Sequence, residues 1–391
     1  MELLYTLTSY PPAIGGAQIH THLLVQQMQQ AHEVTVACHW SQNRTDWLLG
    51  TTLKHPPACQ YVVDDISVTQ LGLSYRQRLA LLPCVAFYYL LMEKALPPIA
   101  NTISSLLQQS VAQSDLIHNV RMGREGLSWG SFNLARKKDI PFVFTPLHHP
   151  RWTGWRYRQY IQLYQEADAV IALTTAEKKI LVELGVQPEN IHITGIGPVL
   201  SPQAGPEAFR TAHNLTGPIV LFLGQHYAYK GYRHLLEATS IVWSRHPDAH
   251  FVFIGPSVKQ SEKAFAEYSD RRIHRLGTVS LQDKTNALAA CTLLCVPSTQ
   301  ESFGGVYTEA WQFGKPVVGG NISAVADVVD EGIDGYLVEQ EPGAIADRII
   351  DLLNHPSRAA SMGQAGRRKV EDRYTWQQLA AATEQVYQLV T

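Results

Sequence analysis

Short runs of β-branched and aromatic residues alternate with helical patterns along almost the whole chain. Alternation of this kind indicates parallel strands joined by crossover helices that cover both faces of a sheet. The pattern breaks between Gly197 and Pro206, where glycines and prolines gather, and then begins again. We therefore expect two doubly wound α/β domains, with strands in the first at Leu3–Thr8, Glu33–Ala37, Leu116–His118, Phe142–Thr145, Ala169–Leu173 and Ile191–Thr194, and in the second at Ile219–Leu223, Phe251–Ile254, Ile273–Leu276, Leu293–Val296, Pro316–Val318 and Gly335–Val338.

The length and charge of the chain agree with this division and exclude one class of partner. At 391 residues the chain is too long for one ordinary hydrophobic core, and 45% hydrophobic with 17% charged residues is typical of globular domains. We place the domains at 1–200 and 206–372, followed by a helical segment at 373–391. The formal net charge is -2 and the sequence has no basic stripe with interleaved aromatics, so we expect no nucleic-acid partner.

The segment from Pro297 to Ala310 holds two glutamates, Glu301 and Glu309, on either side of a glycine pair. Gly304 and Gly305 lack a Cβ, so their backbone can approach a ligand closely. The residues that follow predict a helix whose first N–H groups and positive dipole end suit a phosphate. The two carboxylates can accept hydrogen bonds from sugar and ribose hydroxyls. The segment therefore predicts a sugar-nucleotide site; the alternative is a plain glycine turn before a helix with acidic residues in its first turns.

This segment resembles the E-x7-E signature of retaining GT-B glycosyltransferases, in particular glycosyltransferase family 4. The resemblance covers most of the chain and is strongest from about Pro218 onward, where a buried strand pattern and the run Asp334–Val338 follow in the family's order. It implies a GT-B fold, in which two Rossmann-like domains face each other across a cleft. The first would be the acceptor domain and the second the nucleotide-sugar donor domain, with the C-terminal helix crossing back to pack on the first.

The resemblance also implies an activity. The chain is expected to move a sugar, in a hexosyltransferase-like reaction, from a nucleoside diphosphate sugar to a hydroxyl of a glycan or lipid-linked acceptor, with retention of anomeric configuration, in polysaccharide or envelope glycan biosynthesis. No D-x-D pair occurs in the sequence, so we expect no metal and no cofactor besides the co-substrate, with Lys230 and helix amides in place of a cation. The alternatives are a sugar-nucleotide epimerase or a glucan phosphorylase on the same scaffold, and a non-catalytic partner that only binds the nucleotide sugar.

The resemblance assigns donor contacts in the second domain. The run Gly224–Gly231 resembles the family's G-R-x4-K-G loop, in which an arginine and a lysine neutralise the donor diphosphate. Lys230 matches the lysine, whereas Gln225 stands in place of the arginine and offers donors without charge, so His226 becomes a candidate for the missing contact. Glu301 is expected to orient the sugar and Glu309 to hold the ribose. The donor-binding set in this domain is Gln225, Lys230, Glu301, Phe303, Gly304, Gly305, Val306 and Glu309.

Two loops of the first domain supply further candidates. The loop from Ser9 to Ala17 joins the first strand to the first helix and resembles the family's P-P-x-x-G-G loop, which implies that Gly15 and Gly16 lie near the donor diphosphate; a plain tight turn is the alternative. The family also places a histidine after the fourth predicted strand, near the anomeric centre. We assign that role to His149, with His148 second, and the alternative is a pair of neutral imidazoles bonded to their own loop. With Lys230 and Glu301, His149 completes the expected catalytic group.

Cysteine usage and apolar stretches bear on location. Five cysteines, an odd number without C-x-x-C spacing, predict buried free thiols in a reducing compartment, and the first residues lack a signal-peptide pattern, so we expect a cytoplasmic protein.

The longest apolar stretch, Leu79–Met92, has 14 residues, short of the about 20 that span a bilayer. It predicts a helix packed on the first domain. The alternative is an interfacial helix with Tyr88, Tyr89, Arg76 and Arg78 at headgroup level, which makes a peripheral contact with the inner membrane face.

Overall fold

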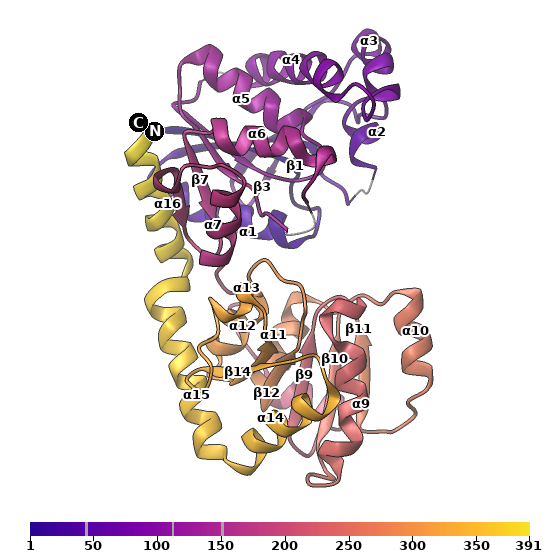
Figure 1. The fold of residues 1–391 in the computed structure, drawn as a ribbon. Coiled ribbons are helices and arrows are strands. Elements are labelled where there is room, and N and C mark those ends of the chain that lie inside the picture. The colour runs from indigo at the N-terminus through magenta and orange to yellow at the C-terminus, as the bar shows by residue number, and fades with distance from the viewer. Residues whose placement is uncertain (44–45, 112, 150–151) are drawn as a thin grey trace. The chain divides into compact units, whose positions relative to one another are not determined.

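The computed structural model describes residues 1–43, 46–111, 113–149 and 152–391 (Figure 1). The chain forms two compact units. The first unit comprises Met1–Thr194 and Trp376–Thr391, and the second unit comprises Gly195–Thr375. The first unit is therefore assembled from two separate stretches of sequence, whereas the second is continuous.

The first unit contains an eight-stranded sheet with the strand order β3-β4-β2-β1-β5-β6-β7-β8. Neighbouring strands are parallel, except that β3 and β4 form an antiparallel edge. The strand order reverses between β1 and β5, so the loops after these two strands open at a topological switch point, where open α/β sheets bind ligands. The strands are β1 (Glu2–Ser9), β2 (Glu33–Trp40), β3 (Cys59–Val63), β4 (Ile66–Gln70), β5 (Leu116–Val120), β6 (Phe142–Thr145), β7 (Ala169–Ala172) and β8 (Ile191–Ile193).

Helices cover both faces of this sheet. In β1, Leu4 belongs to one buried cluster and its neighbours Leu3 and Tyr5 to the other, because alternate side chains of a strand point to opposite faces. The first cluster includes residues of α4, α5 and α6, and the second includes residues of α1 and α16. The helices of this unit are α1 (Gly16–Met28), α2 (Trp47–Thr51), α3 (Tyr75–Ala86), α4 (Met92–Ser110), α5 (Gly126–Lys138), α6 (Arg158–Glu166), α7 (Thr175–Glu183) and α16 (Trp376–Val390).

The C-terminal helix α16 is part of the first unit. Its Tyr387 is fully buried, and the Tyr387 hydroxyl lies 2.5 Å from the hydroxyl of Tyr5 in β1 and 2.6 Å from Nδ1 of His118 in β5. The helix also packs against α1, where the rings of His20 and Trp376 are 5.4 Å apart. This confirms the predicted return of the C-terminal helix to the first domain.

The second unit contains a six-stranded, fully parallel sheet with the order β11-β10-β9-β12-β13-β14. This is the order 3-2-1-4-5-6 of the Rossmann fold, with its switch point between β9 and β12. The predicted α/β class with two doubly wound sheets is confirmed. The strands are β9 (Ile219–Leu223), β10 (His250–Ile254), β11 (Ile273–Gly277), β12 (Leu293–Val296), β13 (Val317–Gly320) and β14 (Gly335–Val338). The helices are α8 (Pro206–Ala212), α9 (Tyr232–Trp243), α10 (Lys259–Ala266), α11 (Leu281–Ala290), α12 (Gly305–Gln312), α13 (Ser323–Ala326), α14 (Pro342–Asn354) and α15 (Pro356–Lys369).

Two expectations need correction. The apolar stretch Leu79–Met92 is not one helix, because α3 ends at Ala86 and α4 begins at Met92 after an intervening turn. Among the described residues, no helix combines the length and the apolar character that crossing a bilayer requires. The five cysteines are free thiols, but only Cys38, Cys291 and Cys295 are buried; Cys84 is half-buried, and Cys59 lies exposed on the edge strand β3.

Candidate functional site

The loops that follow β9 and β12 are fastened together at the switch point of the second sheet. Gly231 has a φ of +81°, and a Cβ there would lie 2.6 Å from the carbonyl oxygen of Pro297. Only glycine combines this backbone conformation with so close an approach. The N–H of Thr299 donates to the carbonyl of Tyr229 at 2.8 Å, and the Gln340 side chain donates to the carbonyls of Tyr229 and Pro297 at 3.1 and 2.7 Å. The two loops therefore form one fixed platform.

Lys230 and Glu301 form an ion pair on this platform. The Lys230 ammonium lies 2.5 Å from Oε1 of Glu301, and the Ser298 hydroxyl donates to the same oxygen at 2.8 Å. Both charged side chains are largely buried. A lysine at this place is a compact positive charge with three donors, so it can contact an anion while it keeps its carboxylate partner.

The amino terminus of α12 lies on the same loop. Gly304 precedes the helix with a φ of +86°, and a Cβ there would lie 2.3 Å from the ring of Tyr307. The Tyr307 ring is fixed in turn, because its hydroxyl donates to the carbonyl of Val296 at 2.9 Å. The N–H groups of Gly305 and Val306 belong to the first turn and have no intrahelical acceptor, so they and the helix dipole favour an anion at this end.

Glu309 lies in the second turn of α12 and is buried. Its Oε1 accepts from the Lys284 ammonium of α11 at 2.7 Å. Burial raises the pKa of Glu309, and the Lys284 charge opposes that rise. The sequence did not point to Lys284, since it carries no motif and occupies an ordinary helix position.

Three expected donor contacts of the second unit require comment. Phe303 is buried and packs edge-to-face against Tyr374 at 5.4 Å, so only its backbone remains for a ligand. Gln225 is exposed at the start of the loop after β9. His226 is fully buried among the rings of Phe222, Tyr232, Phe253 and Phe265. Burial, with Arg275 second, lowers the pKa of His226 to about 4, so a neutral core ring cannot supply the charge that was expected of it.

In the first unit, the predicted glycines follow β1 at its switch point. Gly15 caps α1 in an extended conformation, and Gly16 begins the helix with no atom within 4 Å of a Cβ placed on it. Gly16 does not require glycine for its backbone or its packing, whereas a Cβ on Gly15 would clash with Gln18, a buried side chain that donates to the Ser9 hydroxyl at 2.9 Å. Both remain candidates because they leave the amino end of α1 uncovered by side chains of their own.

The two histidines after β6 differ in their surroundings. His148 is buried; its N–H donates to Oε1 of Glu177 at 2.5 Å, and burial with the nearby Arg121 lowers the pKa of its ring to about 4. His149 is half-buried, with its ring 5.7 Å from that of Trp152. Glu177 also accepts from the N–H of Leu173, so it ties the loop after β6 to the loop after β7. The more accessible ring is therefore that of His149.

Sequence reasoning missed Glu177, Gln340 and Lys284, which act on the predicted residues through backbone contacts or an ion pair. Ser298 was within the quoted segment, and its spacing of three from Glu301 is the one signal that pointed to it. Within the part of the chain that the structure describes, no group of three or more His, Cys, Asp or Glu side chains is arranged to hold a metal ion.

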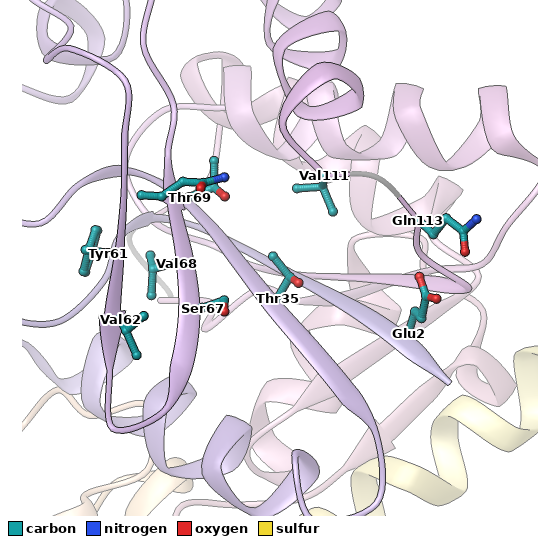
Figure 2. A pocket seen from close by; sticks show the side chains of 10 residues that line it. Glu2, Thr35, Tyr61, Val62, Ser67, Val68, Thr69, Val111 and Gln113 are labelled. Atoms are coloured by element: carbon teal, nitrogen blue, oxygen red, sulfur yellow. The ribbon is translucent and has the colours of Figure 1, made fainter.

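A cavity of about 410 Å³ lies elsewhere in the first unit (Figure 2). Figure 2 shows Thr35 and Ser67 on adjacent strands, with Tyr61 on one side of the opening and Glu2 and Gln113 on the other. Glu2 begins β1, so the cavity reaches the amino ends of strands, opposite to the edge at which such sheets bind ligands. None of the predicted site residues lines it.

Two family models match the chain: "Glycosyl transferase 4-like domain" over residues 15–197 and "Glycosyl transferases group 1" over residues 206–369. Among curated proteins, the MMP alpha-(1->4)-mannosyltransferase of Mycolicibacterium hassiacum is 26% identical over 304 residues, which is 70% of each chain. Spore coat protein SA of Bacillus subtilis is 29% identical over 201 residues, covering 48% of this chain and 53% of that protein. The chain spans about half the length of several of the curated relatives it matches.

The solved structures show a common fold. HepE of Anabaena, in complex with UDP and glucose, has a TM-score of 0.72 at 18% identity and covers 100% of this chain and 99% of its own. At this identity the likeness shows the fold, and it extends from the first unit through the second. It confirms the predicted GT-B fold class.

Proposed function

The chain belongs to the group 1 glycosyltransferases, with a 4-like amino-terminal domain, and from this premise we propose that it transfers a glycosyl group from a nucleoside diphosphate sugar to a hydroxyl acceptor. The observation that carries the proposal is the Lys230–Glu301 ion pair, fixed at the switch point of the second sheet beside the amino end of α12. A diphosphate and its sugar need a cation, free amides and a carboxylate close together, and this loop platform supplies all three.

The proposed reaction retains the anomeric configuration. The bond from the anomeric carbon to the donor phosphate breaks, a bond to the acceptor oxygen forms on the same face, and the acceptor proton passes to the departing phosphate. Lys230 and the amides of Gly305 and Val306 stabilise the negative charge on the leaving diphosphate. Glu301 orients the sugar, Glu309 accepts from the ribose hydroxyls, and His149 supports the anomeric region. No metal takes part in this scheme.

Gln225 sets this chain apart from the family pattern. Its exposed amide can donate to a phosphate oxygen but carries no charge, and His226 is turned into the core. Lys230 is thus the single side-chain cation that we assign to the diphosphate. A weakened phosphate site would leave a protein that binds the nucleotide sugar without turnover, which is the alternative function that this residue favours.

A thermal-shift panel with UDP, GDP, ADP and their common sugar conjugates tests the donor proposal. A ligand that binds only the folded state stabilises it by about 2.7 kcal/mol when the ligand concentration is one hundred times Kd. The melting temperature rises as a result. We expect one nucleotide family to stabilise the protein, and the shift to be reduced in Glu301→Gln and Glu309→Gln. Glu237→Gln, which alters an exposed ion pair with Arg233 on α9, is the matched control.

A turnover assay distinguishes the transferase from the non-catalytic binding partner. Release of the nucleoside diphosphate from the stabilising donor, with a product whose anomeric configuration is read by NMR, supports the transferase. Binding without any release, even in the presence of mixed glycan and lipid-linked acceptors, supports the non-catalytic partner. No shift with any member of the panel contradicts both.

An exposed apolar surface on the first unit supports a membrane-linked acceptor. Tyr75, Leu79 and Leu82 recur at the spacing of one helix face on α3, and Leu79 and Leu82 are 60% and 50% exposed. The opposite face of α3 packs Leu81 into the core. The turn after the helix adds Leu90, which is 78% exposed. Because α3 has apolar side chains on its outer face as well as on its inner face, the outer face is suited to contact lipid.

The charges around this surface are mainly positive. Exposed Arg76 lies on α3 itself, exposed Lys94 lies in the first turn of α4, and Arg156 lies 5.7 Å from the ring of Tyr89. The acidic Glu93 is paired with Arg158 at 3.2 Å. Basic residues at the rim of an apolar surface complement an anionic bilayer, so we propose that this surface docks there, on the cytoplasmic leaflet.

Sedimentation with vesicles tests this contact. We expect the protein to bind vesicles of phosphatidylcholine with phosphatidylglycerol more than vesicles of phosphatidylcholine alone, and binding to fall with salt. The double variant Leu79→Ser/Leu82→Ser should remove it. The control Ile333→Ser changes an equally exposed residue, 62%, in the second unit. A concentration-dependent dimer that the double variant abolishes, without vesicle binding, would instead assign the surface to a second copy of the chain.

A further inference from the structure

An ion pair between Lys284 and Glu309 joins α11 and α12 of the second unit. Lys284 lies in the first turns of α11, and its ammonium contacts Oε1 of Glu309 in α12 at 2.7 Å. The side chains are 19% and 8% exposed. A lysine held this far from solvent opposite a carboxylate has lost much of its rotamer freedom, so the orientation of Glu309 is well defined.

The second oxygen of Glu309 has a different environment. Oε2 is buried and has no hydrogen-bond partner among the described residues. A buried carboxylate oxygen without a donor costs free energy, and native structures retain few of them. The lack of a donor to Oε2 is explained if a bound ligand supplies the hydrogen bond. The vicinal hydroxyls of a ribose are donors of the required kind.

The ionisation of Glu309 depends on few groups. Burial favours the protonated carboxyl, and the opposing influences are the Lys284 ammonium first and the nearby N–H of Val199 after it, although that N–H makes no hydrogen bond to Oε2. The other elements packed against α12 are β12, β13, α15 and the π-helical segment Val370–Tyr374, and no ionisable side chain from them acts on this carboxyl. Neighbouring Asp283 is engaged with the Ser280 hydroxyl at 2.7 Å. Lys284 is thus the one side-chain charge, within the described residues, that keeps Glu309 an acceptor.

We propose that Lys284 is a positioning residue for donor binding: it holds one oxygen of the Glu309 carboxylate so that the other accepts from the ribose hydroxyls of the nucleotide. This inference rests on the proposed function, since it needs Glu309 to bind the ribose. It predicts that Lys284 acts through Glu309 and touches no reacting atom. Loss of Lys284 should therefore raise the donor KM and leave kcat close to its original value.

Calorimetric titration with UDP, GDP and ADP tests the proposal in four variants of the full chain. Lys284→Met should weaken the binding of whichever nucleotide the original protein binds by about tenfold, and Lys284→Arg should restore most of it. Glu309→Gln should lose affinity as well. The double variant Lys284→Met/Glu309→Gln should bind no more weakly than Glu309→Gln alone, because the lysine has no effect without its carboxylate.

The pH dependence gives a second measure. Without the lysine charge, Glu309 remains protonated to higher pH and loses one acceptor oxygen. The affinity of Lys284→Met for the nucleotide should therefore rise as pH increases from 6 to 9, while that of the original protein changes less. Arg233→Met, which breaks an exposed ion pair on α9, is the control and should leave both affinity and pH profile unchanged.

The outcomes separate this inference from the function on which it rests. If the original protein binds a nucleotide and Glu309→Gln loses it, but Lys284→Met binds normally, the positioning role is wrong and the donor site stands. If the losses in the double variant add, or if Lys284→Arg fails to restore binding, Lys284 acts independently of Glu309 and the inference is overturned. If the original protein binds none of the three nucleotides, the proposed donor class itself fails.

Discussion

Gly231 and Pro297 are in such close contact that a Cβ on the glycine would come within 2.6 Å of the proline carbonyl oxygen. The contact joins the loop of Lys230 to the loop of Glu301, the two residues that we assign to the diphosphate and the sugar. The spacing between these loops is therefore set by the absence of a side chain at one position. Any larger residue must displace backbone, since the opposing atom belongs to the main chain.

Replacement of Gly231 by alanine should separate the loops and weaken donor binding. The positive φ of 81° alone should cost about 1–2 kcal/mol, and the contact with Pro297 should add about 1–3 kcal/mol. The matched control is Gly332→Ala, because Gly332 has a φ of +76° and no atom within 4 Å of the added Cβ. Chemical denaturation and nucleotide titration of both variants measure the difference. Equal losses in the two would show that the contact with Pro297 has no role.

Replacement of Lys230 by alanine should lower kcat more than it weakens donor binding. The charge on the diphosphate grows as the glycosidic bond breaks, so a cation at this place stabilises the transition state more than the ground state. Loss of one such group lowers kcat by roughly 10²–10³-fold. Steady-state kinetics with the donor varied gives the two parameters. An increase in KM at constant kcat would assign Lys230 to binding alone.

Replacement of His226 by phenylalanine should stabilise the protein in acid and leave donor binding intact. The folded-state pKa of about 4 lies below the ordinary value of 6.5, so the unfolded state binds more protons between these limits. The stability due to this neutral ring is complete above pH 6.5 and is lost as pH falls toward 4. Phenylalanine does not titrate and suits the surrounding rings, so the variant should gain about 1–2 kcal/mol at pH 5. Thermal melts at pH 5 and pH 7.5, with nucleotide titration, provide the comparison; a loss of nucleotide affinity would restore His226 to the phosphate site.

The two histidines after β6 should respond differently to alanine. His148 is 2% exposed and packed within the first unit, so His148→Ala should lower stability by about 1–3 kcal/mol. His149 is more accessible, and His149→Ala should lower kcat by about tenfold or more with little change in melting temperature. Kinetics and melts on both variants decide the assignment. If His148→Ala loses turnover at full stability instead, the roles are reversed.

Most strands could be predicted because parallel strands buried on both faces have a sequence signal of their own. Ile219–Leu223 and Leu293–Val296 are short, continuous apolar runs, and the structure has β9 and β12 at the same residues. The edge pair β3 and β4 was missed, since Cys59–Val63 is largely exposed and mixes polar with apolar residues. Its strand character comes from pairing with β4, which single-sequence patterns do not contain.

The candidate site residues were proposed from residue type and from motif resemblance. Gly304 was singled out because a residue without a Cβ lets the backbone approach a ligand, whereas Lys230, Gly231 and Glu301 were singled out because their segments resemble family motifs. Lys284, Glu177 and Gln340 were not found, because each acts on a partner far away in sequence: Lys284 on Glu309, Glu177 on the loop of His148, and Gln340 on Pro297. Only the fold brings such pairs together. His226 was misassigned because its neighbours in sequence are loop residues, whereas its neighbours in space are aromatic rings.

The contacts of Tyr387 with Tyr5 and His118 have a consequence for how the protein is made. The ribosome makes β1 well before α16, so the first sheet lacks the contact with Tyr387 until α16 has been made. The second unit, by contrast, is a continuous run that leaves the exit tunnel before α16 does. Because domains fold as their residues emerge, the platform formed by the loops after β9 and β12 should be complete while α16 does not yet cover its face of the first sheet. During that interval the apolar side chains of β1 and β5 that pack with Val386 and Tyr387 are uncovered, so this half of the nascent chain offers a surface that a chaperone can bind.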